Sequence, residues 1–459
     1  MPRAPFVSLV CSVALALPAL CLAADSSYVW TVRAGGARHD KTRGLCTDRA
    51  GNVYMTGEFG ETADFGKEKL TSRGDYDFFV AKYSPKGECL WARGGGGSKT
   101  DRGYGVAVDD QGDVFVTGHY QSPDALFGSE YSLPLRGDYD VFTAKYDSSG
   151  KLLWIRTAGG ERYDYGHGIG VDSAGNCYVT GGVVGNTTYG DTAVENPTGS
   201  HLFLVKYSPA GKLTWVRESK GNSASGQGLV VDRAGNSWAV GGTTGPVDFG
   251  GASLSGTGAD LLLVKYNPDG KALWAAGGGG NSNGVAVGVG IDRDGNAYVG
   301  GMLKGTATIG STTFTSHGEY DMLAAKFDPQ GKPVWAHTGG GPKTDYCLGI
   351  AADPKGGCYA VGEIAGSTMF EDQNIVSAGG QDLYVAHYDA AGKPVSIRPG
   401  GGEKDDLCYC IALDGKAHAY LSGAFNGTTK YGDTAAITSI GGNDIFLTKL
   451  RLGTRSMGK

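Results

Sequence analysis

Tryptophan recurs at a nearly constant interval along this chain, and that spacing constrains the fold more than any other feature. Six tryptophans follow one another at intervals of 59 to 63 residues, at Trp30, Trp91, Trp154, Trp215, Trp274 and Trp335. One interval further on, Ser396 takes the same place, because GKPVSIRPGGG matches GKPVWAHTGGG one copy earlier. The chain of 459 residues is therefore predicted to contain seven copies of a repeat of about 61 residues.

Each copy is predicted to contribute four short β-strands, because its apolar residues alternate with period two and show no helical periodicity. The first strand, such as GVAVD, ends at an aspartate, and D-x-x-G-N turns such as DRAGN and DSAGN follow. Aspartate caps such a turn and glycine supplies its positive φ, so we expect a hairpin to a second strand such as VYMTG. A long connection leads to a third strand such as DYDFFVAKY, and a tight turn then leads to the strand that carries the tryptophan. Repeated antiparallel sheets of four short strands are typical of an all-β fold, the β-propeller.

The D-x-x-G-N-x-Y-V-x-G and D-x-F-V-A-K-Y patterns, together with the recurring W…GG, resemble the seven-bladed β-propeller repeat family called SBBP. The resemblance extends from about residue 28 to residue 451. It implies a secreted or cell-surface protein of bacteria, and it implies an architecture rather than an activity.

The two ends of the repeat region predict how such a ring would close. The seventh copy stops after its third strand, NDIFLTKLRL, whereas SYVWTVRAGG near the start is a fourth strand with no third strand before it. The strand count balances only if this N-terminal segment becomes the outermost strand of the last blade, which also hides two exposed sheet edges. Residues 25–459 are therefore predicted to form a single seven-bladed propeller of four-stranded antiparallel blades.

Glycine accounts for 80 of the 459 residues, and many of these glycines fall on one face of each first strand. In GHGIG, residues 166–170, glycine alternates with His167 and Ile169, and other copies place small residues at the same positions. Successive side chains of a strand point to opposite faces, and blades converge toward the axis of a propeller, so one face must be small. GHGIG is therefore predicted to be an inner strand rather than a phosphate-binding loop, and His167 to be a packed side chain.

Five copies have an aspartate at the start of the first strand: Asp40, Asp101, Asp164, Asp345 and Asp406. Repeat geometry predicts that these residues surround one mouth of the central channel, on the side of the long, variable loops where function usually resides. Three interpretations remain open. Each aspartate caps its own glycine-rich loop; or Asp101, Asp164, Asp345 and Asp406 bind a cation, for which Ca²⁺ is the best candidate; or the aspartates form a polar ligand pocket with Tyr165 and Tyr346.

Residues 1–24, MPRAPFVSLVCSVALALPALCLAA, have the pattern of a secretory signal peptide, with Arg3, an apolar run and small residues before the cleavage point. No lipid anchor is expected, because Leu20 immediately before Cys21 fits a lipid-attachment motif poorly. No later segment is long and apolar enough to span a membrane. Acidic and basic residues are interspersed without a basic block, so nucleic acid is not an expected partner. We expect a monomer that is secreted, periplasmic or located at the cell surface.

The chain shows no G-x-S-x-G, H-E-x-x-H or comparable catalytic motif, and Ca²⁺ is the only cofactor under consideration. The sequence therefore favours a non-catalytic binding or scaffold module that recognises a protein or a glycan through the loop face around the channel. The alternative is a polysaccharide-active enzyme that uses the channel-mouth carboxylates as acid and base. Binding is favoured over catalysis, because aspartates repeated at equivalent positions differ from the asymmetric pair that an enzyme tunes.

Overall fold

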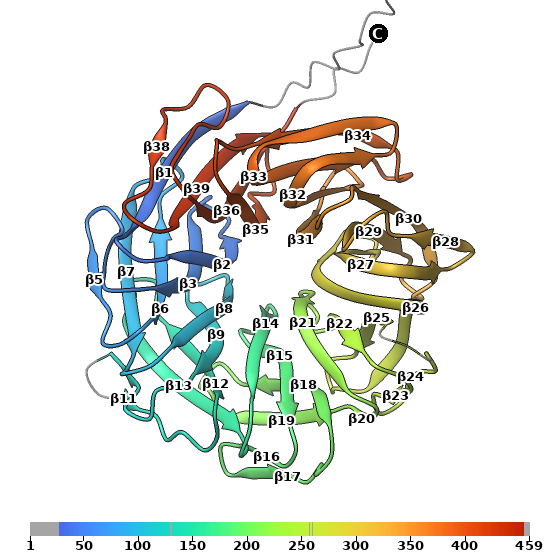
Figure 1. Cartoon of the computed structure of the whole chain (residues 1–459). Helices are drawn as coiled ribbons and strands as arrows, with labels where there is room; N and C mark the ends of the chain where they lie inside the picture. Colours follow the sequence, from blue (N-terminus) through green and yellow to red (C-terminus); the bar gives the residue numbers. More distant parts are fainter. Residues whose placement is uncertain (1–26, 129–130, 257, 259, 454–459) are drawn as a thin grey trace, which may run out of the picture.

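The computed structural model describes residues 27–128, 131–256, 258 and 260–453, and all regular elements in these ranges are β-strands paired in antiparallel sheets. The predicted all-β fold is confirmed. The sheets follow one another in chain order around a central opening (Figure 1). The signal peptide predicted for residues 1–24 lies outside the described residues. Within the described ranges, no helix has the length and apolar character needed to cross a membrane.

The first strand of each repeat lies nearest the central opening (Figure 1), and the second strand pairs with it. These inner strands are β2 (Lys41–Thr47), β8 (Asp101–Val108), β14 (Tyr165–Val171), β21 (Ala224–Val231), β26 (Ala272–Ile291), β31 (Tyr346–Ala352) and β35 (Asp406–Leu413). The second strands are β3 (Val53–Phe59), β9 (Val114–Tyr120), β15 (Cys177–Val184), β22 (Ser237–Thr243), β27 (Ala297–Ile309), β32 (Cys358–Phe370) and β36 (His418–Phe425).

The third and fourth strands complete each sheet on its outer side. The third strands are β6 (Asp77–Tyr83), β12 (Asp140–Tyr146), β18 (Ser200–Tyr207), β25 (Asp260–Tyr266), β29 (Asp321–Phe327), β33 (Gln373–Tyr388) and β39 (Asp444–Arg451). The fourth strands are β1 (Tyr28–Gly36), β7 (Cys89–Gly96), β13 (Leu152–Gly159), β19 (Leu213–Glu218), the beginning of β26, β30 (Pro333–Gly340) and β34 (Pro394–Gly400). The order β8-β9-β12-β13 shows the arrangement within one repeat.

Short strands in the long connections extend the sheets in a way that the sequence does not predict. The pair β16 (Thr187–Tyr189) and β17 (Thr192–Val194), for example, adds to the outer edge of β13 from the preceding repeat. The other short strands are β4 (Thr62–Asp64), β5 (Lys69–Thr71), β10 (Leu126–Phe127), β11 (Tyr131–Ser132), β20 (Lys220–Gly221), β23 (Val247–Asp248), β24 (Ser253–Leu254), β28 (Thr312–Thr315), β37 (Thr428–Thr429) and β38 (Ile437–Thr438). Several consecutive repeats are thus linked through their outer edges, whereas β20, β23 and β24 and the pair β37–β38 form small sheets of their own.

The D-x-x-G-N segments form the predicted hairpin turns between inner and second strands. In the turn after β14, Asp172 Oδ1 accepts hydrogen bonds from the backbone N–H groups of Ala174 and Asn176, each at 2.9 Å. Gly175 has a φ of 78°, which explains why glycine occupies this position. The turn therefore sets the register that directs the larger face of β14 toward the centre.

The repeating tryptophans connect each sheet to the next one. Trp91 in β7 is 6% exposed, and its Nε1 donates a hydrogen bond of 3.2 Å to the carbonyl oxygen of Ser148 in the following repeat. A β-carbon on Gly150 would lie 2.9 Å from the Trp91 ring, so this turn position favours glycine. Trp154 makes the same contact with the carbonyl of Pro209, at 3.0 Å. Tryptophan and turn glycine therefore recur together because each indole packs under a turn of the neighbouring repeat.

The inner strands approach one another closely through their small face. A β-carbon on Gly105 would lie 2.5 Å from the carbonyl oxygen of His167, and one on Gly168 would lie 2.6 Å from the amide nitrogen of Leu229. Real β-carbons do not approach backbone atoms so closely, and only glycine fits at these positions. The prediction that GHGIG is an inner strand, here β14, is confirmed.

Candidate functional site

The five aspartates predicted at the channel mouth stand at or immediately before inner strands, and none of them is exposed to solvent. Asp101 accepts hydrogen bonds from Gly97 N at 2.9 Å, Gln121 N at 2.9 Å and Ser122 Oγ at 2.6 Å. The other four likewise accept a hydrogen bond from a glycine N–H four residues earlier, in the pairs Gly36–Asp40, Gly160–Asp164, Gly341–Asp345 and Gly402–Asp406. These contacts are the ones expected if each aspartate caps its own loop.

A second aspartate, from a third strand, lies beside each of the five. The pairs are Asp40 with Asp444, Asp101 with Asp77, Asp164 with Asp140, Asp345 with Asp321 and Asp406 with Asp382. In every second aspartate, Oδ1 is buried and has no hydrogen-bond partner within the described structure. Burial, to which the charge of Asp101 adds, raises the pKa of Asp77 to about 7. This second set was not predicted from the sequence, although four of its members begin a third strand and Asp382 lies within one.

The proposed Ca²⁺ ligands are already engaged by protein donors. The oxygens of Asp101, Asp164, Asp345 and Asp406 accept hydrogen bonds from loop N–H groups and, in two cases, from a serine or threonine hydroxyl. Within the described ranges, no group of three or more His, Cys, Asp or Glu side chains is placed to bind one metal ion. The Ca²⁺ site and the ligand-binding role of the five aspartates stay predictions.

A cavity of about 500 Å³ lies among the inner strands. Its wall is built from the larger face of those strands, in two tiers. One tier is aliphatic and contains Leu45, Val106, Ile169, Leu229, Val289, Ile350 and Ile411. The other tier is chemically mixed and contains Arg43, Tyr104, His167, Gln227, Val287, Leu348 and Tyr409. The lining of the cavity is therefore chemically uniform in the aliphatic tier, whereas it changes from one strand to the next in the mixed tier.

Every member of the mixed tier occupies a β-bulge. The register of β2 shifts between Thr42 and Gly44, around Arg43, and that of β14 shifts between Gly166 and Gly168, around His167. The remaining inner strands show the same shift at the equivalent residue. A bulge adds one unpaired residue to a strand and redirects its side chain, and bulges are enriched beside active sites. The bulges thus direct these side chains into the cavity.

Arg43 anchors the polar side of the cavity through a buried ion cluster. Its Nε and Nη2 donate to the two oxygens of Glu58, at 2.6 and 2.8 Å, and Arg102 Nε lies 3.3 Å from Glu58 Oε2. Its guanidinium lies over the ring of Tyr104, 4.8 Å from the ring centroid. Although burial opposes it, the charges of Arg43 and Arg102 hold the pKa of Glu58 below its usual value.

His167 lies beside this cluster, in contact with two tyrosines. Its ring centroid is 4.4 Å from that of Tyr104 and 4.9 Å from that of Tyr165. Burial, together with the charge of Arg43, lowers the pKa of His167 to about 4, so the imidazole is neutral at pH 7. The predicted packing of His167 is thus accompanied by a place in the cavity wall, and its Nδ1 has no hydrogen-bond partner in the described structure.

Glu363 in β32 adds a carboxyl group to the cavity wall. It is 6% exposed, and its Oε2 has no hydrogen-bond partner in the part of the chain that the structure describes. Burial, to which the charge of Asp405 adds, raises the pKa of Glu363 to about 7, although the charge of Lys41 opposes this shift. Of the two tyrosines predicted as ligand residues, Tyr346 lines the cavity near Glu363, whereas Tyr165 packs against His167.

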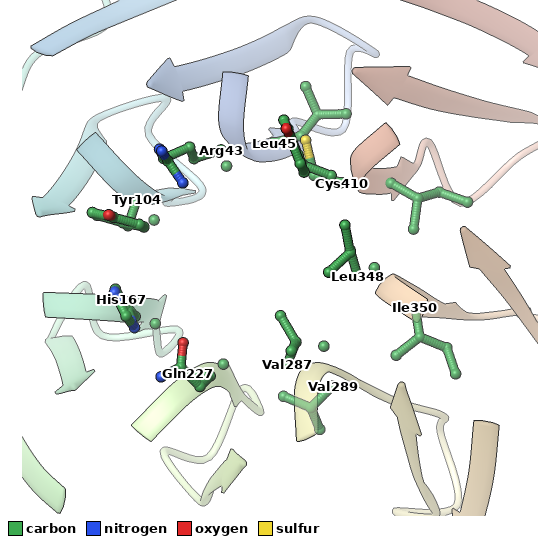
Figure 2. Close-up of a pocket in the computed structure, with 18 of the residues that line it drawn as sticks. Arg43, Leu45, Tyr104, His167, Gln227, Val287, Val289, Leu348, Ile350 and Cys410 are labelled. Carbon is green, nitrogen blue, oxygen red and sulfur yellow. The ribbon is translucent and has the colours of Figure 1, made fainter. Parts of the chain in front are cut away.

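The cavity therefore has a polar side and an apolar side. Figure 2 shows Arg43, Tyr104, His167 and Gln227 along one side, and Val287, Val289, Leu348 and Ile350 along the other. The sequence contains a signal for this asymmetry, because the bulge position varies in size and chemistry between copies while the two flanking positions stay small. Functional sites on repeat scaffolds are expected where the repeat symmetry breaks.

A comparison with family models matches residues 153–181 to the SBBP family, described as Beta-propeller repeat. The resemblance stated from the sequence is confirmed for this segment. One curated relative, an uncharacterized WD repeat-containing protein of Acanthamoeba polyphaga mimivirus, is 23% identical over 477 residues. The alignment covers 83% of this chain and 34% of the relative, so the chain spans about a third of that protein's length.

Solved structures that are similar to this chain include a protein of unknown function from Dyadobacter fermentans, with 10% identity and a TM-score of 0.44. The alignment covers 93% of this chain and 99% of that chain. Another is the PQQ-bound aldose sugar dehydrogenase from Streptomyces coelicolor, with 12% identity, a TM-score of 0.39, and coverage of 93% and 98%. A third is regucalcin, a calcium-binding protein from Agrobacterium tumefaciens, with 8% identity, a TM-score of 0.34, and coverage of 93% and 96%.

Proposed function

We propose that the chain is a seven-bladed β-propeller whose N-terminal strand completes the last blade. Antiparallel pairing of β1 with β39, with Thr31 opposite Thr448, supports this closure. Two further contacts join the first repeat to the last one. Thr47 Oγ1 donates to the carbonyl of Leu413 at 2.8 Å, between β2 and β35, and Asp40 lies beside Asp444.

The function that this geometry supports best is a non-catalytic binding module that recognises a protein or a glycan through the central channel and its loop face. The observation that carries the proposal is the asymmetric cavity wall on an otherwise repetitive scaffold. Ligand pockets generally have volumes of roughly 300–1,000 Å³ and combine apolar surface with a few convergent polar groups. The cavity of about 500 Å³, with Tyr104 and His167 facing Val287 and Leu348, has both features.

The signal peptide predicted for residues 1–24 and the SBBP resemblance support a location outside the cytoplasm. We propose that the mature chain is a monomer that is secreted, periplasmic or attached to the cell surface by its partner. Neither nucleic acid nor a membrane span is part of this proposal.

The proposal is tested by presenting the purified mature chain to a glycan array and to proteins of the extracellular fraction. Any ligand recovered is then titrated by calorimetry against the wild-type protein, Tyr104→Ala and Tyr131→Ala. Tyr104 lines the cavity, whereas Tyr131 is a 38% exposed residue of the short outer strand β11 and is absent from the cavity wall. We expect Tyr104→Ala to weaken binding by about tenfold or more, as loss of a central aromatic contact usually does, and Tyr131→Ala to leave binding unchanged.

Equal affinity of the wild type and Tyr104→Ala for every recovered ligand would place recognition elsewhere and overturn the proposal. Polysaccharide turnover by the wild-type protein would favour the enzymatic alternative instead, above all if Asp101→Asn and Asp164→Asn each abolish that turnover while thermal unfolding shows that both variants remain folded.

A further inference from the structure

Glu363 is a buried acid without a counterion in the wall of the cavity. The described structure shows no hydrogen bond to its Oε2 and no ion pair to its carboxylate. The charge of Lys41 is near enough to oppose the rise in the pKa of Glu363 that burial and Asp405 cause. The two side chains nevertheless form no ion pair in the described structure. A buried carboxylate that lacks a partner is costly, because the loss of hydration is not compensated. Such a group indicates a missing partner.

Another repeat of the same chain contains the partnered form of this arrangement. Glu58 in β3 and Glu363 in β32 occupy equivalent positions. Each directly follows the glycine of its second strand that pairs with the third strand. Glu58 pairs with Arg43 from the inner strand of its own repeat and with Arg102 from the next one. Arg43 also lies over the ring of Tyr104. The first repeat thus holds a guanidinium between a carboxylate and a tyrosine.

The sixth repeat has the carboxylate and the seventh repeat has the tyrosine, but leucines stand at the two arginine positions. Leu348 takes the place of Arg43 at the bulge of β31, and Leu407 takes the place of Arg102 in β35. Tyr409 takes the place of Tyr104, and the charge of Glu363 contributes to raising the pKa of Tyr409. Replacement of both arginines by leucine leaves an apolar lining and an uncompensated acid, with the cavity beside them.

We propose that the cavity binds an organic cation, a guanidinium group on an aliphatic stem, between Glu363 and Tyr409. This inference rests on the proposed function, because it assigns a ligand chemistry to the same channel. The guanidinium would occupy the place that Arg43 occupies between Glu58 and Tyr104, with charge-assisted hydrogen bonds to the carboxylate and its face against the phenol ring. Its stem would contact Leu348, Val287 and Met302, which line the adjoining apolar wall. A free guanidine compound and an arginine side chain of a peptide both present this chemistry.

Calorimetric titration of the mature protein with butylguanidinium at pH 8 tests the inference, with butylurea as the uncharged compound of similar shape. We expect one butylguanidinium to bind per chain and butylurea not to bind. Titration with free arginine and with the peptide Gly-Arg-Gly then distinguishes the two sources of the group. Tighter binding of the peptide assigns the site to a protein partner, and tighter binding of free arginine assigns it to a small molecule.

Two variants place the cation at Glu363. Glu363→Gln keeps the shape of the side chain and removes its charge, and we expect binding to weaken tenfold or more. Leu348→Arg copies Arg43 into the sixth repeat, so the new guanidinium should pair with Glu363 and exclude butylguanidinium. Glu88→Gln makes the same change of charge as Glu363→Gln at an exposed position and should bind as the wild type does.

Absence of butylguanidinium binding to the wild type, or equal binding by Glu363→Gln, overturns the inference. Thermal unfolding of each variant establishes that it is folded, and Glu363→Gln remains informative if Leu348→Arg does not fold. If a glycan or protein ligand is lost in Tyr104→Ala while butylguanidinium does not bind, the proposed function stands and only the cation site fails. If no ligand of either kind binds in the channel, both fail.

Discussion

Buried carboxyl groups are the most unusual single residues of this protein. Each of the five predicted aspartates accepts hydrogen bonds from loop N–H groups. Each also lies beside a second aspartate that has one unpartnered oxygen in the described structure. Two adjacent carboxylates in a buried place cannot both ionise cheaply. Burial, with a contribution from the charge of the neighbouring aspartate, raises the pKa of Asp40 and of Asp77 to about 7. These two pairs therefore hold loops in place at the cost of stability at neutral pH.

Stability should fall as the pH rises through the range in which these aspartates ionise. Burial raises the pKa of Asp77 to about 7 in the folded protein, well above its usual value of 3.8. Because the folded-state pKa is the higher one, the contribution of protonated Asp77 is fully present below about pH 4 and is lost as the pH rises through about 7. We expect Asp77→Asn, which stays neutral, to raise the free energy of unfolding at pH 8 by on the order of 1–3 kcal/mol.

Urea denaturation of the wild type and of Asp77→Asn at pH 4.5 and pH 8 measures this effect. Asp75→Asn is the matched control, because Asp75 is exposed two residues earlier in the same loop. The free energies of unfolding of the wild type and of Asp77→Asn should differ at pH 8 and converge at pH 4.5. A larger gain from Asp77→Asn at pH 4.5 than at pH 8 would contradict the assigned direction.

The inner strand is the element that determines both packing and site. Its small face contacts the next inner strand, and its larger face lines the cavity, with a bulge that directs one side chain inward. Glycine is therefore required on one face for a steric reason, while the bulge residue on the other face is free to vary. The same strand therefore packs against its neighbour through one face and forms part of the asymmetric cavity wall with the other.

Gly168→Ala should destabilise the protein strongly, whereas Gly242→Ala should not. A β-carbon on Gly168 would lie 2.6 Å from the backbone nitrogen of Leu229, so adjacent inner strands would have to move apart. A β-carbon on Gly242 would meet its nearest atom, in Val285, at 3.5 Å, an ordinary contact. We expect a loss of about 1–3 kcal/mol for Gly168→Ala, as is typical of overpacking. Chemical denaturation of both variants measures the difference, and equal stabilities would remove the steric explanation.

The elements that repeat could be predicted from the sequence, and the residues that do not repeat could not. The hairpin turns at Asp172 and the glycine face of β14 follow from local rules of turn and strand chemistry. The bulge at His167 does not, since an unpaired residue leaves no mark in the alternation of small and large side chains. The environment of Glu363 was not predicted either, because Leu348 and Leu407 are recognised as the equivalents of Arg43 and Arg102 only when the strand registers of the repeats are compared.

The proposed closure of the ring sets how the whole molecule unfolds. In a closed propeller each sheet contacts two neighbours. At the seam, hydrogen bonds between β1 and β39 join strands from opposite ends of the chain within one blade. Thr31 and Thr448 lie directly opposite at this seam, and their Oγ1 atoms are 2.8 Å apart. Opening of the seam would expose two strand edges at once.

The double variant Thr31→Cys, Thr448→Cys should therefore be more stable in its oxidised, disulfide-bonded form than in its reduced form. The expected difference in the free energy of unfolding is about 4–5 kcal/mol, the value for closing a very long loop in the unfolded chain. The opposed register of the two residues suits the short β-carbon separation that a disulfide requires. The seven native cysteines in the described residues are unpaired, and six of them are buried, so they compete little for the new bond. Thermal unfolding of the oxidised and reduced double variant measures the gain, with each single variant as a control that cannot form the bond. An open ring would keep the two thiols apart, and the double variant would then remain reduced under oxidising conditions or unfold at the same temperature in both states.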